Sequence, residues 1–191
     1  MKRIVVGLAV FVATLVVGAP AAHAHPFAFA LPQGFVDLSP GVPDGNWKGV
    51  NPQVKQMVQQ GGFVYYAADV KGAADGFMEN VNVTLADSPG PITEASLKTF
   101  ASQMDGELKK VSPQAGYTPV SWNVVTIGGV TSGRLVGLTK LPGVVTKQIA
   151  YIIPSGKITA IITYSTTEKE FARYEKIFDA AAQSTKGAKP Q

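Results

Sequence analysis

The stretch that decides the fold reads GKITAIITY at residues 156–164 and is followed by TEKEFARYEKIFDAAAQ at residues 167–183. The first part is rich in β-branched residues and predicts a strand. In the second part, Thr167 and Glu170 have the spacing of a capping box, which predicts a helix start. The helix then carries an apolar stripe at helical spacing, which consists of Phe171, Tyr174, Ile177, Phe178, Ala181 and Ala182. A strand followed by an amphipathic helix indicates a sheet whose face the helix covers.

Two hairpins extend this sheet towards the N-terminus. Residues 144–153 and 157–164 flank a Pro-Ser-Gly turn at 154–156, and residues 121–126 and 130–138 flank Gly128-Gly129. Short turns with glycine between β-branched runs are typical of antiparallel hairpins.

Three earlier segments complete the set of strands. Residues 27–30 and 63–67 are apolar, aromatic or β-branched, and residues 77–85 contain apolar and β-branched residues between polar ones. In the last of them polar and apolar residues alternate, which predicts one face on the core and one face in water. The polar positions are Asn80, Asn82 and Thr84, and the apolar positions are Val81, Val83 and Leu85.

A helix after Thr93, reaching about residue 111, has its own apolar stripe at Leu97, Phe100, Ala101, Met104, Leu108 and Val111. Residues 39–62 predict a long loop with a short helix over 52–60 capped by Asn51. The order of strands, helix, strands and helix predicts an α+β domain, in which an antiparallel sheet is covered by amphipathic helices in an α/β/α sandwich.

This order of segments resembles the PsbP-like superfamily of α/β/α sandwiches. The likeness rests on residues 29–35 (FALPQGF), on residues 79–83 (ENVNV) and on residues 156–164 with the closing helix. The superfamily includes secreted bacterial proteins of unknown function. The resemblance implies a module that acts by binding another protein. Because a fold does not carry function with it, no functional residue is transferred to this chain.

The N-terminus has the features of a cleaved secretory signal. Lys2 and Arg3 precede an uninterrupted apolar run at residues 4–18, and Ala22-His23-Ala24 has the small-x-small pattern of a cleavage site. We expect residues 1–24 to be removed, residues 25–185 to form one domain, and residues 186–191 to be a frayed tail. The mature protein is therefore expected in the periplasm or outside the cell.

Composition excludes several classes of partner and anchor. The chain contains no cysteine, so it forms no disulfide and carries no lipid anchor on cysteine. Lys109-Lys110 is the only adjacent basic pair of the mature chain, which does not favour a nucleic-acid partner. After the N-terminal run no segment is apolar enough to span a membrane.

No motif for catalysis or for a cofactor is present. His25 is the only histidine left after cleavage, and it lies at the new N-terminus. A metal site made of cysteine and histidine is therefore excluded. A calcium site is the one open alternative, if the carboxylates near the ends of the central strands gather; these are Asp69, Asp75, Glu79 and Asp87. We assign no catalytic, cofactor-binding or metal-ligating residue and expect no cofactor.

Trp47 and Lys48 are the candidate partner-binding residues. They lie in the middle of the long loop, and such a loop in a compact domain is typically functional. Tryptophan is also enriched at the energetic centres of protein interfaces. The alternative is that Trp47 pins the loop to the core.

We favour a secreted or periplasmic, non-catalytic protein-binding module whose protein partner is unidentified. The first alternative is a carrier of a small molecule or lipid, which needs a cavity between helix and sheet. The second is a hydrolase that uses carboxylates, although no catalytic motif supports it.

Overall fold

The computed structural model describes residues 27–28, 30–60, 62–72, 77–88 and 90–187. A seven-stranded antiparallel sheet has the strand order β2-β3-β4-β8-β7-β6-β5, and β1 pairs with β9 separately. The strands are β1 (Phe27–Ala28), β2 (Val36–Asp37), β3 (Tyr65–Ala68), β4 (Asn80–Asp87), β5 (Gly116–Ile127), β6 (Val130–Leu141), β7 (Val144–Ser155), β8 (Ile158–Thr167) and β9 (Lys186–Gly187). The helices are α1 (Pro52–Gln60), α2 (Glu94–Val111) and α3 (Phe171–Gln183), with a 3-10 turn, η1 (Asp44–Trp47), before α1.

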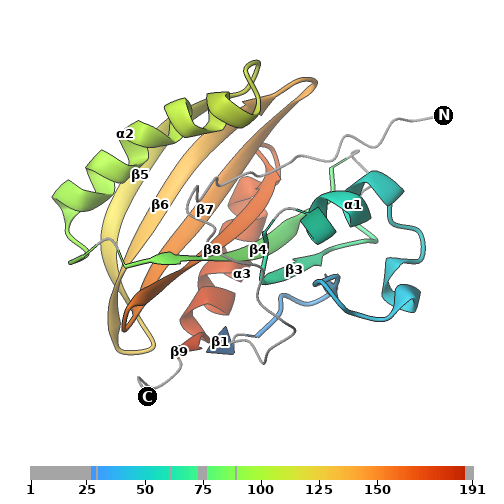
Figure 1. Cartoon of the computed structure of the whole chain (residues 1–191), viewed down its shortest axis with the longest axis horizontal. Helices are drawn as coiled ribbons and strands as arrows, with labels where there is room; N and C mark the ends of the chain where they lie inside the picture. Colours follow the sequence, from blue (N-terminus) through green and yellow to red (C-terminus); the bar gives the residue numbers. More distant parts are fainter. Residues whose placement is uncertain (1–26, 29, 61, 73–76, 89, 188–191) are drawn as a thin grey trace.

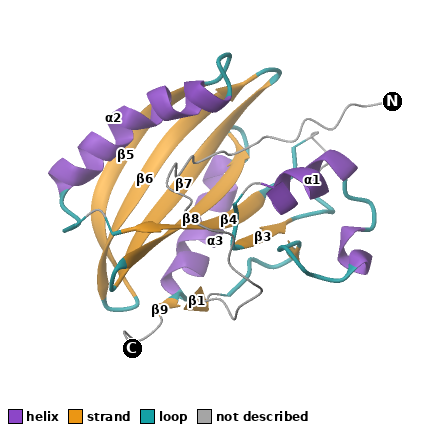
Figure 2. Cartoon of the chain, viewed as in Figure 1, coloured by secondary structure: helices purple, strands orange, loops and turns teal. Residues whose placement is uncertain are grey.

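The helices cover both faces of the sheet, which confirms the α+β fold class (Figure 1). We call the two faces the α2 face and the α3 face. Figure 2 shows α2 and α1 on the near side of the sheet and α3 on the far side. Each face therefore has its own apolar core, as expected of a layered sandwich.

The core of the α3 face is built around Phe178. Its ring is completely buried and lies 4.8 Å from that of Tyr164 and 5.4 Å from that of Tyr174, centroid to centroid. The predicted stripe of α3 is confirmed except at Ile177, which is 39% exposed. At 100° per residue, Ile177 lies on the flank of the stripe rather than within it.

Helix α2 begins as predicted at Thr93. Its hydroxyl accepts a hydrogen bond from the Ser96 N–H, and the Ser96 hydroxyl accepts one from the Thr93 N–H, which forms a capping box. Leu97, Ala101, Met104 and Leu108 are buried against the sheet. The stripe therefore sets which side of α2 faces the strands.

The capping box predicted at Thr167 and Glu170 is wrong. Thr167 is the last residue of β8 and pairs with Thr146 of β7, so it is not available as a cap. Helix α3 begins only at Phe171, after Glu170, whose side chain makes no capping bond. Pairing in the sheet thus takes precedence over the local capping signal.

The predicted wet face of residues 77–85 is also wrong. Asn80, Asn82 and Thr84 of β4 are 2%, 1% and 6% exposed, although they point to the face opposite Val81 and Val83. The prediction fails because β4 lies in the middle of the sheet, between β3 and β8, where helices lie over both faces. A strand covered by helices on both faces has no face in water.

Both hairpins are confirmed, and their strands are longer than predicted. The turn between β5 and β6 uses Gly128 at φ 55° and Gly129 at φ 83°, which are conformations that favour glycine. The short helix over 52–60 is confirmed as well, and Asn51 accepts a hydrogen bond from the Gln53 N–H at 2.8 Å.

The chain ends of the described part meet in the β1–β9 pair, where Phe27 lies opposite Gly187. Lys186 and Gly187 thus form a strand where the sequence predicts the start of a frayed tail. The rest of that tail, 188–191, the predicted signal at 1–24 and His25 lie outside the described residues.

Candidate partner-binding surface

The two candidate partner-binding residues differ in exposure, since the Trp47 side chain is buried and Lys48 is exposed to solvent. The Trp47 side chain is 8% exposed and packs into a cluster with residues of α1 and of β3, including Val54, Val58 and Tyr66. Lys48 is exposed. The buried ring matches the alternative in which Trp47 pins the loop. The contact of Trp47 and Lys48 with a partner stays a prediction.

Polar contacts hold this loop in place. Lys55 donates a hydrogen bond to Asp44 at 2.6 Å, and its ammonium lies 5.8 Å from the centre of the Trp47 ring. The Asn46 amide donates to the main-chain carbonyl of Asp37 at 2.9 Å. The segment is therefore attached to the sheet edge at β2 as well as to α1.

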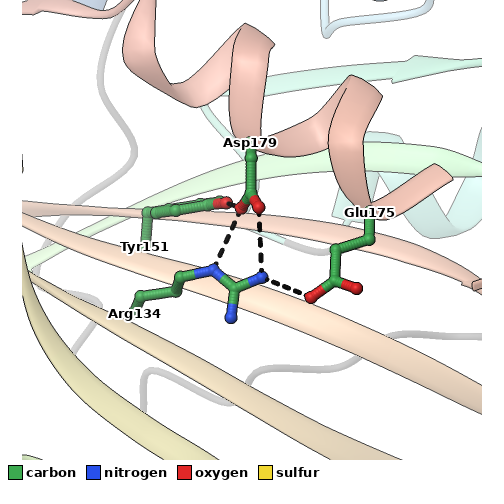
Figure 3. A network of polar contacts seen from close by, with 4 residues as sticks. All are labelled: Arg134, Tyr151, Glu175 and Asp179. Atoms are coloured by element: carbon green, nitrogen blue, oxygen red, sulfur yellow. Dashed lines mark hydrogen bonds and ion pairs between the residues drawn. The ribbon is translucent and has the colours of Figure 1, made fainter. Parts of the chain in front are cut away.

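An ion-pair network joins α3 to the sheet at Arg134 (Figure 3). Arg134 Nε donates to Asp179 Oδ1 at 3.0 Å, and its Nη2 donates to Glu175 Oε1 at 2.8 Å and to Asp179 Oδ2 at 3.3 Å. The Tyr151 hydroxyl donates to the same Asp179 Oδ1. Arg134 and Tyr151 lie opposite each other on β6 and β7, while both carboxylates come from α3.

This network has the features of a structural clamp, because it joins two strands to α3 through the ion pairs of Arg134 and the hydrogen bond of Tyr151. The guanidinium grips Asp179 with a two-pronged contact, which is the strong geometry for such pairs. Burial raises the pKa of the Tyr151 hydroxyl, and the neighbouring Asp179 carboxylate raises it further. Tyr151 therefore keeps its proton at neutral pH, which argues against a role as a general base.

Of the acidic residues considered for calcium, Asp69 and Glu79 are neighbours, since the Asp69 N–H donates to the Glu79 carbonyl oxygen at 2.9 Å, whereas Asp87 lies far from both. Glu79, before the start of β4, is buried and accepts a hydrogen bond from Thr166 at 3.1 Å. Asp87 is at the other end of β4, about 26 Å away along an extended strand. Asp69 accepts hydrogen bonds from the main chain of residues 71 and 72, and Asp75 lies outside the described residues. Within the described ranges no group of three metal-ligating side chains occurs.

A row of buried hydroxyl and amide groups crosses the α2 face on β4 and β8. Asn82 lies opposite Thr163, and Asn80 lies opposite Ser165. The side chains of Asn82, Thr84, Thr163 and Ser165 have no hydrogen-bond partner. A buried polar group left unpaired costs on the order of 1–3 kcal/mol, so this row lowers the stability of the sheet.

The cavity that a carrier needs is small in the described part of the chain. Between α2 and the sheet a cavity of about 110 Å³ is lined mainly by apolar side chains, among them Leu97, Phe100, Ile152 and Ile161. Typical ligand sites measure about 300–1,000 Å³. This cavity does not favour the carrier hypothesis.

Strand β5 presents the most unusual surface. It is 12 residues long, contains no charged residue and lies at the edge of the sheet with β6 on one side. Val120 and Val124 are 49% and 40% exposed. Natural edge strands are usually short or carry charged side chains that prevent pairing with other chains.

Among the described residues, the contacts that protect the edge of β5 lie in its first half. Asp105 of α2 accepts a hydrogen bond from the Tyr117 N–H at 2.8 Å, and the pairing with β6 shifts register between Pro119 and Ser121. The hydrogen bond from Lys109, followed by that from Tyr117, lowers the pKa of Asp105. From Ser121 to Ile127 the register with β6 runs without interruption.

Sequence reasoning predicted the β5 hairpin but missed its edge position, because strand order depends on contacts distant in sequence. It also missed the Arg134 clamp. The one available signal was the spacing of Glu175 and Asp179, which lie one turn apart on the predicted helix.

Comparisons with known proteins show which solved structures have a similar fold. No family model and no curated protein sequence matches the chain. Among solved structures, the cyanobacterial PsbP (CyanoP) of Synechocystis sp. PCC 6803 is similar at 16% identity with a TM-score of 0.59, over 85% of this chain and 86% of that one. The Ran-binding protein Mog1p of Saccharomyces cerevisiae is similar at 11% identity with a TM-score of 0.54, over 86% of this chain and 91% of that one. LpqN, involved in cell envelope biogenesis of Mycobacterium tuberculosis, is similar at 14% identity with a TM-score of 0.53, over 84% of this chain and 82% of that one.

These similarities confirm the predicted resemblance at the level of the fold, which is PsbP-like. Across the described residues, none of the helices has the length and apolar character needed to cross a membrane.

Proposed function

We propose that this PsbP-like chain is a secreted or periplasmic, non-catalytic module that binds another protein. The observation that carries the proposal is the exposed, uncharged edge of β5 with Val120 and Val124 on it. Long, uncharged sheet edges are sites where another chain can pair. The use of the same fold by the Ran-binding protein Mog1p supports the proposal.

Two further points favour binding over catalysis. Arg134 is held in ion pairs with Asp179 and Glu175, and among the described residues no group of three metal-ligating side chains occurs. Neither observation points to a reactive side chain beside an open pocket, which an active site requires.

The loop at Trp47 and Lys48 is a second proposed contact region. Lys48 is exposed next to the buried Trp47, so a partner would contact the loop through Lys48 and its neighbours. In this proposal Trp47 holds the loop in the conformation that presents Lys48.

The export part of the proposal rests on the sequence of residues 1–24. Mass spectrometry of the protein recovered from the secreted or periplasmic fraction is expected to find His25, or a neighbouring residue, at the N-terminus. Recovery of an intact Met1 in that fraction would refute cleavage.

Binding is tested by photo-crosslinking in the producing cells. A photoreactive side chain is introduced at Lys48, at Val124 or at Val145, which is a 36% exposed apolar residue of β7, and the adducts are identified by mass spectrometry. A protein adduct at one or more of these positions is expected. The absence of an adduct at all three refutes the binding function at the surfaces proposed here.

A further inference from the structure

We propose that the partner binds by adding an extended strand to the outer edge of β5 between Ser121 and Ile127. The inference rests on the proposed protein-binding function and specifies its mode. It follows from the hydrogen-bonding pattern of β5, the boundaries of the open edge and the position of α2.

The β5–β6 turn determines which main-chain groups face outward. Ile127 and Val130 flank the two-residue turn Gly128-Gly129. In a two-residue hairpin the flanking pair exchanges both of its hydrogen bonds, and bonded and non-bonded pairs then alternate along the ladder.

The alternation gives β5 two sets of main-chain groups. Those of Asn123 and Val125 are bonded to β6. The N–H and C=O groups of Trp122, Val124 and Thr126 point away from β6, towards the open edge. Outward N–H and C=O groups at every second residue are what an added strand pairs with.

The open segment has a defined beginning and end. On one side, Pro119 has no N–H and the irregular pairing ends at Ser121. On the other side, the turn at Gly128 is close to the chain after α3: a Cβ added to Gly128 would lie 2.6 Å from the Thr185 carbonyl oxygen. Between these limits an added strand of about seven residues fits, spanning about 23 Å.

The side chains along the edge indicate the chemistry of the added strand. Val124 points to the α2 face, as does Trp122, which packs partly against the α2 core. Asn123 points to the α3 face and is exposed. The added strand is therefore uncharged opposite β5 and alternates, with apolar residues towards the α2 face and polar residues towards the α3 face.

The position of α2 argues against a second copy of this chain as the occupant. Of the strands, β5 is the one that α2 contacts most closely. Antiparallel pairing of two β5 strands would place two α2 helices on the same face, above strands only about 4.8 Å apart. Packed helices need about 8–10 Å between their axes, so two α2 helices near such a seam would crowd each other. A partner strand without a helix on that face meets no such obstacle.

The first test measures amide hydrogen exchange in the free protein. We expect the N–H groups of Trp122, Val124 and Thr126 to exchange rapidly, and those of Asn123 and Val125 to be protected. Protection of all five in the free protein overturns the proposal, because the edge would then already be paired.

The second test combines crosslinking with proline substitution. Thr126→Pro removes an outward N–H that the fold does not use, and proline is tolerated at such positions of edge strands. Thr126→Ala is the matched control. We expect the adduct from a photoreactive group at position 124 to fall about tenfold or more with Thr126→Pro, since a lost main-chain hydrogen bond and a blocked edge both weaken pairing. Thr126→Ala is expected to retain the adduct.

The remaining outcomes separate the mode from the function. Adducts at position 48 or 145 without one at position 124 overturn strand addition but leave the protein-binding function intact. An adduct at position 124 whose yield Thr126→Pro does not change has the same two consequences. An adduct at 124 with a second copy of the chain overturns the assignment of the occupant.

A third measurement covers the case in which Thr126→Pro fails to fold. The crosslinked partner segment is synthesised as a peptide and added to the unmodified protein. Slower exchange at Trp122, Val124 and Thr126 supports strand addition, and unchanged exchange at all three overturns it.

Discussion

Replacing Trp47 by alanine tests what holds the long loop before α1. The indole is 8% exposed and packs between α1 and β3, so the substitution empties most of a large side-chain site. A buried tryptophan contributes about 150–250 Å² of contact surface. Truncation of a buried aromatic residue typically costs about 3–5 kcal/mol of unfolding free energy. The loss at Trp47 is expected to be at the lower end of that range, because this segment can unfold locally before the sheet does.

The assay is urea denaturation of the purified Trp47→Ala variant, with Lys48→Ala as the matched control. Lys48 is exposed, so its substitution is expected to change the unfolding free energy by less than about 0.5 kcal/mol. Partner capture, measured on the same preparations, separates the two roles. Loss of capture by Lys48→Ala at unchanged stability would support a contact there. A loss of stability below about 1 kcal/mol for Trp47→Ala would refute the packing argument.

Four further predictions concern the α3 core, the Arg134 network, the buried polar row on β4 and β8, and the contact between α2 and β5. Phe178→Ala removes the central ring of the α3 core and is expected to lower the unfolding free energy by about 3–5 kcal/mol; a shift below about 1 kcal/mol in chemical denaturation would contradict the stacking described. Arg134→Ala leaves two carboxylates of α3 without their cation and is expected to cost about 1–3 kcal/mol in the same measurement, whereas an unchanged midpoint would show that the clamp contributes nothing. Thr163→Val keeps the side-chain shape and removes an unpaired buried hydroxyl, so the thermal midpoint is expected to rise; a fall would mean that the hydroxyl has a partner in solution. The hydrogen bonds from Lys109 and then from Tyr117 lower the pKa of Asp105, so its contribution to stability is present above its unfolded-state pKa of about 4 and is lost as the pH falls through the lower folded-state pKa. Asp105→Asn is therefore expected to flatten the acid limb of the stability–pH curve, and an unchanged limb would contradict a lowered pKa of Asp105 in the folded protein.

Local patterns predicted most of the elements but not their neighbours. The stripes of α2 and α3 and the glycine turn at residues 128–129 are encoded within a few residues. Their predictions were confirmed except at Ile177, and the burial of Val111 lies outside what the structure describes. Thr167 shows the limit of such reasoning: its capping signal is local, but its pairing partner in β7 is distant in sequence and prevails.

The candidate surface was harder to predict for the same reason. An uncharged strand at residues 116–127 is visible in the sequence, but whether it lies in the middle or at the edge of the sheet depends on the order of all seven strands. The alternation in β4 was interpreted as a solvent-exposed face because nothing local reveals that β4 is a central strand. For Trp47, the sequence left two roles open, and only the three-dimensional packing shows that the ring is buried.

The pairing of Phe27 with Gly187 brings the beginning and the end of the domain within about 5.5 Å of each other between Cα atoms. The chain is thus topologically almost a ring, and a short covalent bridge between these two residues would close it without rearranging the sheet. A new pair of ends could then be opened in the exposed turn at Gly143, between β6 and β7, to give a circular permutant. The same geometry has a mechanical consequence. Attachment of the domain through either end holds it at one and the same point, so the open edge of β5 lies equally far from the attachment point in both cases.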